Sequence, residues 1–307
     1  MRKIIFDTDL GSDCDDVMAL DVLLAADKAG DCKLLGVTYS AAAHTGVQCI
    51  HAILRQHGYG DIPLGRIPCP EGFVKRNDVY ATAVAEAFPY KDAPTYESTI
   101  DADSLFRQLL KKNDDVTLVV TGFLSNIAAL LRTKDGCELI RDHVCEIAIM
   151  GGCFSHITCA FPPEDCIAED NSIKPHAEWN ILWDIPAAQD VCSLSPVPLV
   201  FLPYEVGLDM LSGKPMTERG EGKVPDSFAY IIHGSANGRH SWDPATALYA
   251  VYGAKPWFYK SASGKVTVRD NGLTDFAICP EGKHFILACA MMKNEIAAEL
   301  DRLSLTL

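Results

Sequence analysis

The chain has 307 residues, of which 48% are hydrophobic and 22% charged, a composition typical of a globular protein with a sizeable core. Asp and Glu outnumber Lys and Arg by 41 to 27, which gives a formal net charge of −14, and the basic residues are scattered along the sequence. Binding to nucleic acid or to an anionic membrane needs a concentrated positive surface, so we expect neither as a partner.

The first residues and the cysteines bear on the cellular compartment. The chain passes from Arg2 and Lys3 into a short apolar run that ends at Asp7, which is not the pattern of a signal peptide. No apolar run reaches the roughly 18 residues that a transmembrane helix needs. The 12 cysteines contain no CxxC pair, which favours reduced thiols over a disulfide framework. We therefore expect a cytoplasmic protein.

Short apolar runs alternate with longer amphipathic segments through the first two hundred or so residues, a pattern typical of βαβ units. The predicted strands cover residues 3–7, 33–38, 116–121, 144–150 and 197–202. The predicted helices cover about 15–29, 46–57, 79–88, 102–112, 123–132 and 186–193. Because each strand is a nearly continuous apolar run, the pattern indicates a mostly parallel central sheet with helices on both faces.

The pattern changes after residue 204, where glycine-containing turns separate shorter elements. These elements are two helical segments, a set of short strands and a closing helix, at 228–233, 244–251, 264–288 and about 291–303. We find neither a repeat nor a linker that marks a boundary. The sequence therefore predicts one α/β domain over residues 1–307, with C-terminal additions to the core.

The segment DTDLGSDCDD, at residues 7–16, gathers five carboxylates between the first predicted strand and the first predicted helix. Carboxylates so close together repel one another unless solvent or a cation separates them. Capping of the helix by Asp15 and Asp16 explains one or two of the five acids but not all of them. An oxygen-rich cluster at the carboxyl end of a parallel strand suits a hard cation such as Ca²⁺ or Mg²⁺.

This segment resembles the N-terminal signature of the inosine-uridine type nucleoside hydrolases, in the form DTDxGxDxDD. Four further segments fall in the family's order along the chain: DIPLG at 61–65, VTGFLSNIA at 120–128, PHAEWNI at 175–181 and WDP at 242–244. The resemblance covers nearly the whole chain. It implies a single Rossmann-like α/β domain that hydrolyses the N-glycosidic bond of ribonucleosides, usually as a homodimer or homotetramer.

The resemblance also implies a bound Ca²⁺ that coordinates the ribose 2′ and 3′ hydroxyls and the attacking water. Carried over by motif, its ligands would be Asp9, Asp16, the main-chain carbonyl of Thr121, and Asp243. Asp9 would in addition be the general base that takes a proton from the water, which a cation acidifies. Asp15 would accept hydrogen bonds from the ribose diol.

Glu178 and Asn180 are two residues apart in an apolar segment, so we expect them to share one side of an extended stretch. The resemblance implies that they bind ribose hydroxyls, and the alternative is a polar pair that satisfies a turn. For Asp243, which precedes Pro244, the alternative to metal binding is the capping of a helix.

The sequence departs from the family pattern at several positions. Trp242 stands where many members carry a histidine that protonates the leaving base. A purine-specific branch has tryptophan there, so Trp242 favours purine substrates through stacking, with a place in the core as the alternative. His240 is either a surrogate acid or an exposed loop residue, and Asn171 would supply a ribose contact that the family takes from other asparagines. Asp13 has no assigned role: it would either contact the metal ligands from outside the coordination sphere or replace one of them.

The leading hypothesis is therefore a Ca²⁺-dependent ribonucleoside hydrolase. Two alternatives stay open: a nucleoside- or sugar-binding protein that keeps the metal site but has little catalysis, and an N-glycosidase for a modified ribosyl compound. The DxD after the first strand is also found in phosphohydrolases of the HAD type. That reading is less favoured, because Gly11 stands where their motif usually has Thr or Val.

Overall fold

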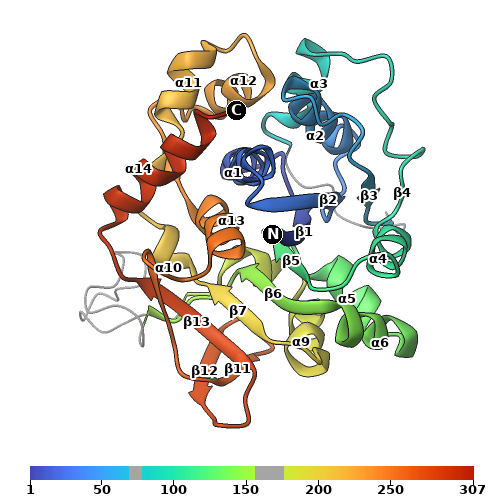
Figure 1. Cartoon of the computed structure of the whole chain (residues 1–307), viewed down its shortest axis with the longest axis vertical. Coiled ribbons are helices and arrows are strands. Elements are labelled where there is room, and N and C mark those ends of the chain that lie inside the picture. The colour runs from blue at the N-terminus through green and yellow to red at the C-terminus, as the bar shows by residue number, and fades with distance from the viewer. Residues whose placement is uncertain (69–77, 156–175) are drawn as a thin grey trace.

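The computed structural model describes residues 1–68, 78–155 and 176–307 (Figure 1). Its main sheet has 11 strands. They are β1 (Arg2–Thr8), β2 (Cys32–Tyr39), β3 (Leu64–Arg66), β4 (Ile100–Asp101), β5 (Val116–Val120), β6 (Val144–Met150), β7 (Leu199–Leu202), β10 (Phe258–Lys260), β11 (Gly264–Val268), β12 (Thr274–Ile278) and β13 (His284–Cys289). The predicted mostly parallel sheet is confirmed.

Along the sheet the strand order is β12-β11-β13-β7-β6-β5-β1-β2-β3-β4, and β10 pairs with β13 beside this row. Every pair from β13 through β4 is parallel, whereas β10 and β12 pair antiparallel with their neighbours, as does β11. The short antiparallel strands are the C-terminal additions that the sequence indicates. Because β1, β5, β6 and β7 are parallel neighbours, their carboxyl ends meet at one edge of the sheet.

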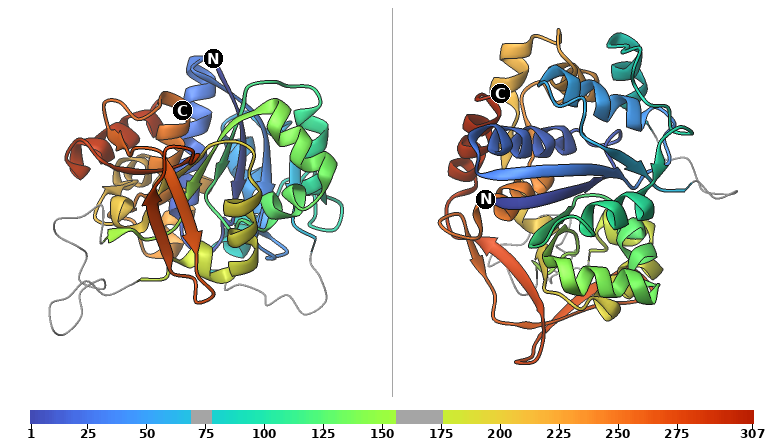
Figure 2. Two further views of the ribbon diagram at one scale, coloured as in Figure 1. Left: turned by 90° about the horizontal axis from the view of Figure 1, so that it is seen from below. Right: turned by 45° about the vertical axis from the view of Figure 1, so that its right-hand side comes forward.

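Helices cover both faces of this sheet, and each face has its own hydrophobic core (Figure 2). One core includes side chains of α1 (Asp15–Ala29), α2 (Gly46–Gln56), α3 (Ala81–Ala87), α12 (Pro225–His233), α13 (Trp242–Tyr252) and α14 (Lys293–Ser304). The other includes side chains of α4 (Ala102–Leu110), α5 (Ser125–Leu131), α6 (Lys134–His143) and α9 (Ile185–Leu194). Strands covered on both sides bury nearly every side chain, which explains their continuous apolar sequence.

Helix α1 is buried along residues 15–26, where it packs against β2 of the sheet and against the helices α13 and α14. It begins with two acids in its first turn, where negative charge interacts favourably with the helix dipole, and it ends at Gly30, whose φ of 82° suits glycine. The polar residues at its N-terminus, and Asp21 in its middle, therefore lie inside the protein.

The predicted strands and helices are all present, with ends that agree to within two residues in the α/β core. The two strands β3 and β4 and the helix α6 were not predicted. The strands have three and two residues, too few for a periodic pattern, and α6 buries only Gly136 and Ile140. Elements with so few buried side chains leave little hydrophobic signal in the sequence.

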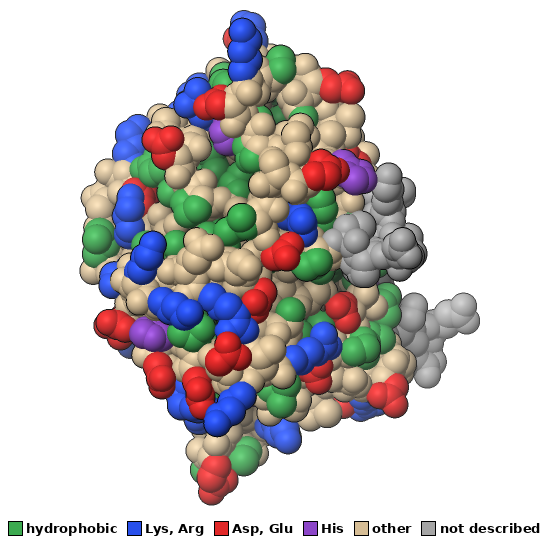
Figure 3. Space-filling model, turned by 90° about the vertical axis from the view of Figure 1, so that its right-hand side faces the viewer, with side chains coloured by type: hydrophobic (Ala, Val, Ile, Leu, Met, Phe, Trp, Pro, Cys, Tyr) green, Lys and Arg blue, Asp and Glu red, His purple; other side chains and the backbone are tan. Residues whose placement is uncertain are grey.

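The surface charges, the hydropathy of the helices and the cysteines bear on the remaining expectations. On the face seen in Figure 3, acidic and basic side chains are interspersed. Within the described ranges no helix is long and apolar enough to cross a membrane. The described cysteines are all free thiols, and five of them are buried.

Candidate active site

A pocket of about 310 Å³ opens at the edge where β1, β5, β6 and β7 end. In open α/β sheets this edge is where ligands bind. One part of its wall is acidic, formed by Asp9, Asp13, Asp15, Asp16, Glu178 and Asp243. Another part is aromatic, formed by His176, Trp179, Tyr204 and Trp242. The pocket therefore suits a molecule that is polar at one end and flat and apolar at the other.

Asp15, Asp16 and Asp243 form a group of buried carboxylates, with one oxygen of each within 4.8 Å of the others. Burial raises the pKa of Asp15 and of Asp243 well above the ordinary value, and the neighbouring acids raise both further. Three such groups cannot all be ionised unless positive charge offsets them. The group could therefore hold a cation.

The carboxylate of Asp16 is held by threonines from two neighbouring strands. Thr8, the last residue of β1, and Thr121, directly after β5, both donate their hydroxyl to Oδ1 of Asp16, the latter at 3.0 Å. Burial raises the pKa of Asp16 to about 7, although these hydrogen bonds favour the ionised form. The two threonines orient this oxygen at the strand ends.

Asp9 is buried and lines the same pocket, packed against the turn that follows β5. A Cβ at Gly122 would lie 2.7 Å from the Cβ of Asp9 and 2.3 Å from Oγ of Ser40, so only glycine allows this approach. The Thr-Gly pair at residues 121–122 thus brings the end of β5 close to the loop after β1.

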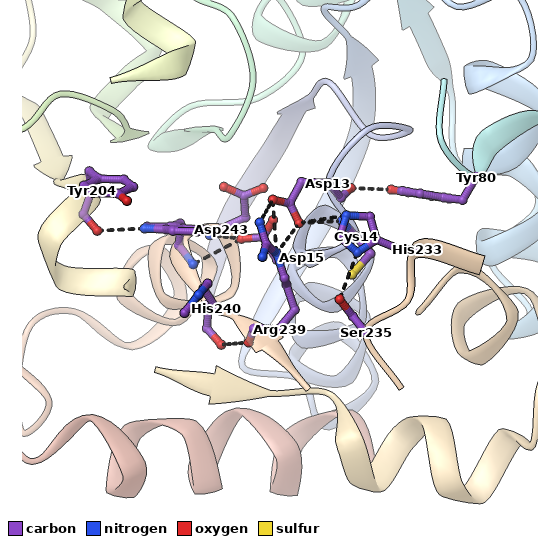
Figure 4. A network of polar contacts seen from close by, with 12 residues as sticks. Asp13, Cys14, Asp15, Tyr80, Tyr204, His233, Ser235, Arg239, His240 and Asp243 are labelled. Atoms are coloured by element: carbon purple, nitrogen blue, oxygen red, sulfur yellow. Dashed lines mark hydrogen bonds and ion pairs between the residues drawn. The ribbon is translucent and has the colours of Figure 1, made fainter. Parts of the chain in front are cut away.

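Asp15 joins this loop to a helix more than two hundred residues away. Its Oδ2 accepts hydrogen bonds from the main-chain N–H groups of Trp242 and Asp243, both at 3.1 Å (Figure 4). These N–H groups belong to the first turn of α13, where an acceptor is otherwise missing. One oxygen of Asp15 therefore caps α13, and this capping sets the position of Asp243 beside Asp16.

The donors in this part of the pocket fit a hard divalent cation. Asp9, Asp16 and Asp243 supply carboxylate oxygens and Thr121 a main-chain carbonyl, a set without nitrogen or sulfur that suits Ca²⁺. The group of mutually close carboxylates includes Asp15, to which the family resemblance gives a role in ribose binding. All the carboxylates predicted as ligands lie in this one pocket.

Asp13, which the sequence leaves unassigned, forms an ion pair with Arg239 (Figure 4). Nε of Arg239 lies 2.9 Å from Oδ1 and Nη2 lies 2.6 Å from Oδ2, a bidentate geometry. Burial alone would raise the pKa of Asp13, but the hydrogen bonds and charge of Arg239 outweigh it and hold the pKa below the ordinary value. Asp13 is thus neutralised by a partner of its own.

The expectation that Glu178 and Asn180 share one side of an extended stretch is wrong. Asn180 lies in the short helix α8 (Trp179–Trp183), and Glu178 is its N-cap, with a carboxylate that accepts from N–H groups of Asn180, Ile181 and Gly152. The prediction failed because a five-residue helix is too short to show helical periodicity. Both side chains still line the pocket.

The amide of Asn180 points to the ends of two strands. Nδ2 donates to the main-chain carbonyl of Thr121 at 2.8 Å and to that of Met150 at 3.2 Å. Burial raises the pKa of Glu178 to about 7, although its hydrogen bonds with main-chain N–H groups favour the ionised form. Each of these residues is thus anchored to the backbone while it faces the pocket.

Trp242 contributes to the aromatic wall but is itself largely covered, with 9% of its surface exposed. Its indole N–H donates to the carbonyl of Tyr204 at 2.7 Å, and the Tyr204 ring stacks near it at 5.7 Å between centroids. The imidazole of His176 stacks on Tyr204 at 4.5 Å, and the Arg239 guanidinium lies 5.3 Å from the centre of the Trp242 ring. Three of the four aromatic rings, those of His176, Tyr204 and Trp242, therefore form a stacked row, of which Trp242 is the most buried.

The predicted substrate contact His240 is not among the residues that line the pocket. Its ring lies against Trp242 at 5.1 Å. Nδ1 of His240 accepts a hydrogen bond from the N–H of Asp209 at 2.8 Å, which fixes the loop after α10 (Tyr204–Gly207). Asn171 lies outside the described residues.

The sequence profile of the inosine-uridine preferring nucleoside hydrolases matches residues 4–282 of this chain. The chain belongs to this family. Among curated relatives, the pyrimidine-specific ribonucleoside hydrolase RihA of Photobacterium profundum is 31% identical over 213 residues, which are 67% of this chain and 61% of RihA. The matched region thus spans less than two thirds of that relative.

Further nucleoside hydrolases resemble the chain over longer stretches. The pyrimidine-specific RihB of Escherichia coli K12 is 28% identical over 249 residues, which are 76% of this chain and 70% of RihB. The structure of a purine-preferring ribonucleoside hydrolase from Gardnerella vaginalis superposes with a TM-score of 0.72 at 19% identity, covering 99% of both chains. At that identity the superposition shows that the two share their fold.

In this member of the family, several residues of the site could not be found from the sequence. Arg239 and Tyr204 stand in segments that carry no motif, and their contacts with Asp13 and Trp242 depend on the folded chain. Thr8 and His176 do lie inside quoted motifs, at positions to which no role was given. The available signal was that Thr8 precedes the predicted ligand Asp9 and that His176 stands two residues before Glu178, a predicted ribose contact.

Proposed function

We propose that this protein hydrolyses the N-glycosidic bond of ribonucleosides to free base and ribose, with Ca²⁺ as its cation. The observation that carries the proposal is the joining, in one pocket, of a buried carboxylate group with a wall of stacked aromatic rings. A nucleoside has the matching division into a polar sugar and a flat base. Membership of the nucleoside hydrolase family supports the same reaction.

Asp9, Asp16, Asp243 and the carbonyl of Thr121 would hold the Ca²⁺. When bound, the ion would fix the ribose diol and lower the pKa of a water beside C1′. Asp9 would accept the proton of the attacking water. Departure of the base leaves positive charge on the sugar ring, which the surrounding carboxylates stabilise.

The sugar is held by the groups anchored on α8 and on the loop after β1. The oxygen of Asp15 that does not cap α13 is available to a ribose hydroxyl, and Glu178 and Asn180 face the sugar from the other side. Because these side chains are fixed to the backbone by hydrogen bonds, the ribose binds without much loss of side-chain entropy.

The base lies along the aromatic wall, on the side of Tyr204 and His176. Trp242 is the most buried ring and is partly shielded by Arg239, so its contact with the base is through a limited part of its surface. Among the described residues, His176 is the histidine that lines the pocket. Its imidazole is suited to protonate a leaving base. Purine preference stays a prediction, since RihA and RihB are named pyrimidine-specific.

The experiment that tests the function is a panel of inosine, adenosine, guanosine, uridine and cytidine, with release of base and of reducing sugar measured in Ca²⁺. The wild type should release both in equal amounts, and Asp9→Asn should lower kcat by at least about a thousandfold while its circular dichroism is unchanged. As a matched control, Asp92→Asn makes the same change on the exposed surface and should keep full activity.

Two results would overturn the proposal or redirect it. Near-normal turnover by Asp9→Asn would refute the role of Asp9. Calorimetric binding of nucleosides without release of base by the wild type would instead favour the nucleoside- or sugar-binding alternative. Trp242→Leu tests the base preference: a purine platform predicts a larger loss of kcat for inosine than for uridine, and equal losses would indicate a structural role.

A further inference from the structure

A second cluster of buried ionisable groups lies on α1, away from the residues that line the pocket. It consists of Asp21 in the middle of α1, His57 directly after α2, and Asp226 in the first turn of α12. The side chains are only 1%, 6% and 2% exposed, respectively. Figure 1 shows the three helices in the same part of the molecule, and α12 packs against both α1 and α2.

The three groups converge on one point through single atoms. Nε2 of His57 lies 3.5 Å from Oδ1 of Asp21 and 3.4 Å from Oδ2 of Asp226. One ligand atom from each residue lies within 4.8 Å of the other two. The cluster thus offers one nitrogen and two oxygens around a shared space.

Hydrogen bonding does not account for this arrangement. Nε2 of His57 carries at most one proton, and charge-assisted N–H···O bonds are about 2.7–2.9 Å long, shorter than either distance. Among the described residues, both carboxylate oxygens of Asp21 and Nε2 of His57 have no hydrogen-bond partner. A fully buried carboxylate without a donor is costly, so the cluster calls for a further positive centre.

Charge leads to the same conclusion. Two carboxylates and one imidazolium leave a net charge of −1 in the interior, whereas two carboxylates, a neutral imidazole and a dication sum to zero. Burial raises the pKa of Asp21 to about 6 against the charge of His57, while Asp21 and Asp226 raise the pKa of His57 to about 9. A protonated His57 therefore offsets the charge of only one of the two carboxylates.

We propose that Asp21, His57 and Asp226 bind a transition-metal dication, for which Zn²⁺ is the best match, as a structural site that ties α1, α2 and α12 together. Zn²⁺ binds imidazole and carboxylate at about 2.0–2.2 Å, and tetrahedral geometry then separates neighbouring ligand atoms by about 3.3–3.5 Å. The separations of 3.4 and 3.5 Å agree with this value.

A supporting residue orients one of the ligands. Nε2 of Gln56 donates to Oδ2 of Asp226 at 2.6 Å, and its Oε1 accepts the N–H of Asp226 at 3.2 Å. Such outer hydrogen bonds are typical of metal-binding carboxylates. The nitrogen donor and the small number of oxygens distinguish this site from the all-oxygen pocket, so the two sites should select different ions.

The site would stabilise the helix that carries the pocket's acids. Asp16 and Asp21 are five residues apart on α1, about 7.5 Å along its axis. A metal bound at Asp21 would therefore fix α1 to two neighbouring helices without taking part in the reaction. We expect the metal to raise the thermal midpoint and to leave kcat nearly unchanged.

The test measures metal content of the full-length protein, stripped with a chelator and then dialysed against Zn²⁺ in excess Ca²⁺. The wild type should retain about one Zn²⁺ per chain by mass spectrometry, and Co²⁺ should give the visible bands of a four-coordinate site. His57→Gln and Asp226→Asn should lose both signals. Asp16→Asn should keep its Zn²⁺, and His51→Gln, which alters another buried histidine of α2, is the matched control.

The alternative to a bound Zn²⁺ is a proton on His57. Measurements on the wild-type protein are enough to distinguish these two possibilities. If stripped wild-type protein takes up less than about 0.1 Zn²⁺ per chain, gives no Co²⁺ bands and shows the imidazole nitrogen shifts of a protonated His57, the proposal is wrong. Equal Zn²⁺ uptake by wild type and folded His57→Gln would also overturn it. Because metal content is independent of turnover, neither result depends on the proposed function.

Discussion

Asp13 and Arg239 are 226 residues apart in sequence and form a bidentate ion pair at the pocket, with Nη2 to Oδ2 at 2.6 Å. The pair joins the loop after β1 to the segment β9 (Arg239–His240), which immediately precedes α13. Both partners are partly buried, at 29% exposure of each side chain. Arg239 therefore neutralises one of the five loop acids and also covers Trp242.

A double-mutant cycle with Asp13→Asn and Arg239→Met should give a coupling energy of about 1–3 kcal/mol in the free energy of unfolding. Either single change leaves a partly buried charge without its partner. The losses of stability in the two single variants should therefore sum to more than the loss in the double variant. Urea denaturation of the four proteins measures this energy. A coupling energy near zero would mean that the pair contributes no more than an exposed surface contact.

Removal of the cation should destabilise the wild type and stop hydrolysis. A chelator is expected to lower the thermal midpoint, and added Ca²⁺ should raise the midpoint again and restore activity, since a ligand that binds only the folded state stabilises it. In Asp16→Asn the added Ca²⁺ should no longer raise the midpoint. Asp92→Asn serves again as the surface control.

Asp16→Asn should also have a defined effect on the thermal midpoint of the cation-free protein. Burial raises the pKa of Asp16 to about 7, so at pH 8 its ionised form destabilises the folded state when no cation is present. Asp16→Asn should therefore have an equal or higher midpoint than the stripped wild type at this pH. A midpoint of Asp16→Asn that still rises with Ca²⁺ would contradict the ligand assignment.

Asn180→Ala should weaken Ca²⁺ binding by about tenfold and raise KM for nucleosides, because the carbonyl of Thr121 loses the donor that orients it. Calcium titration followed by steady-state kinetics separates the two effects. Asn113→Ala is a suitable control, since that amide also donates to a main-chain carbonyl, at 2.9 Å, away from the pocket. Unchanged affinity with lower stability would indicate a purely structural Asn180.

His284 should make the protein less stable in mild acid. Burial lowers its pKa to about 4, and its Nδ1 accepts the N–H of Val266 at 2.9 Å. A histidine with a depressed folded pKa contributes stability that is fully present above pH 6.5, its unfolded value, and is lost as pH falls from 6.5 toward 4. At pH 5 this loss should be on the order of 1–2 kcal/mol.

Urea denaturation between pH 5 and 8 measures this slope. His284→Asn, which can keep the acceptor for Val266 but does not titrate, should have a shallower dependence on pH in that window. His44→Asn, a change at an exposed histidine, should leave the slope as in the wild type. A slope that is the same in all three proteins would assign the acid sensitivity to other groups.

The sequence by itself determined the α/β core and the family. Buried parallel strands are continuous apolar runs, and long helices have a clear period, so both are local signals that survive without the fold. The pocket's acids could be found because most of them stand in one loop, DTDLGSDCDD, and the motif with Asp243 completed the set. Short elements such as β3, β4 and α8 gave no such signal.

Only the tertiary structure decided what each acid contacts. Asp13 forms an ion pair with Arg239, and Asp15 accepts hydrogen bonds from the first turn of α13. Asp21 lies close to His57, which in turn lies close to Asp226. Each of these partners is at least 36 residues away in sequence. In each case the partner is chosen by how helices and strand ends pack, and no local pattern encodes that packing. Burial, which sets the pKa of these acids, is likewise a property of the packed chain.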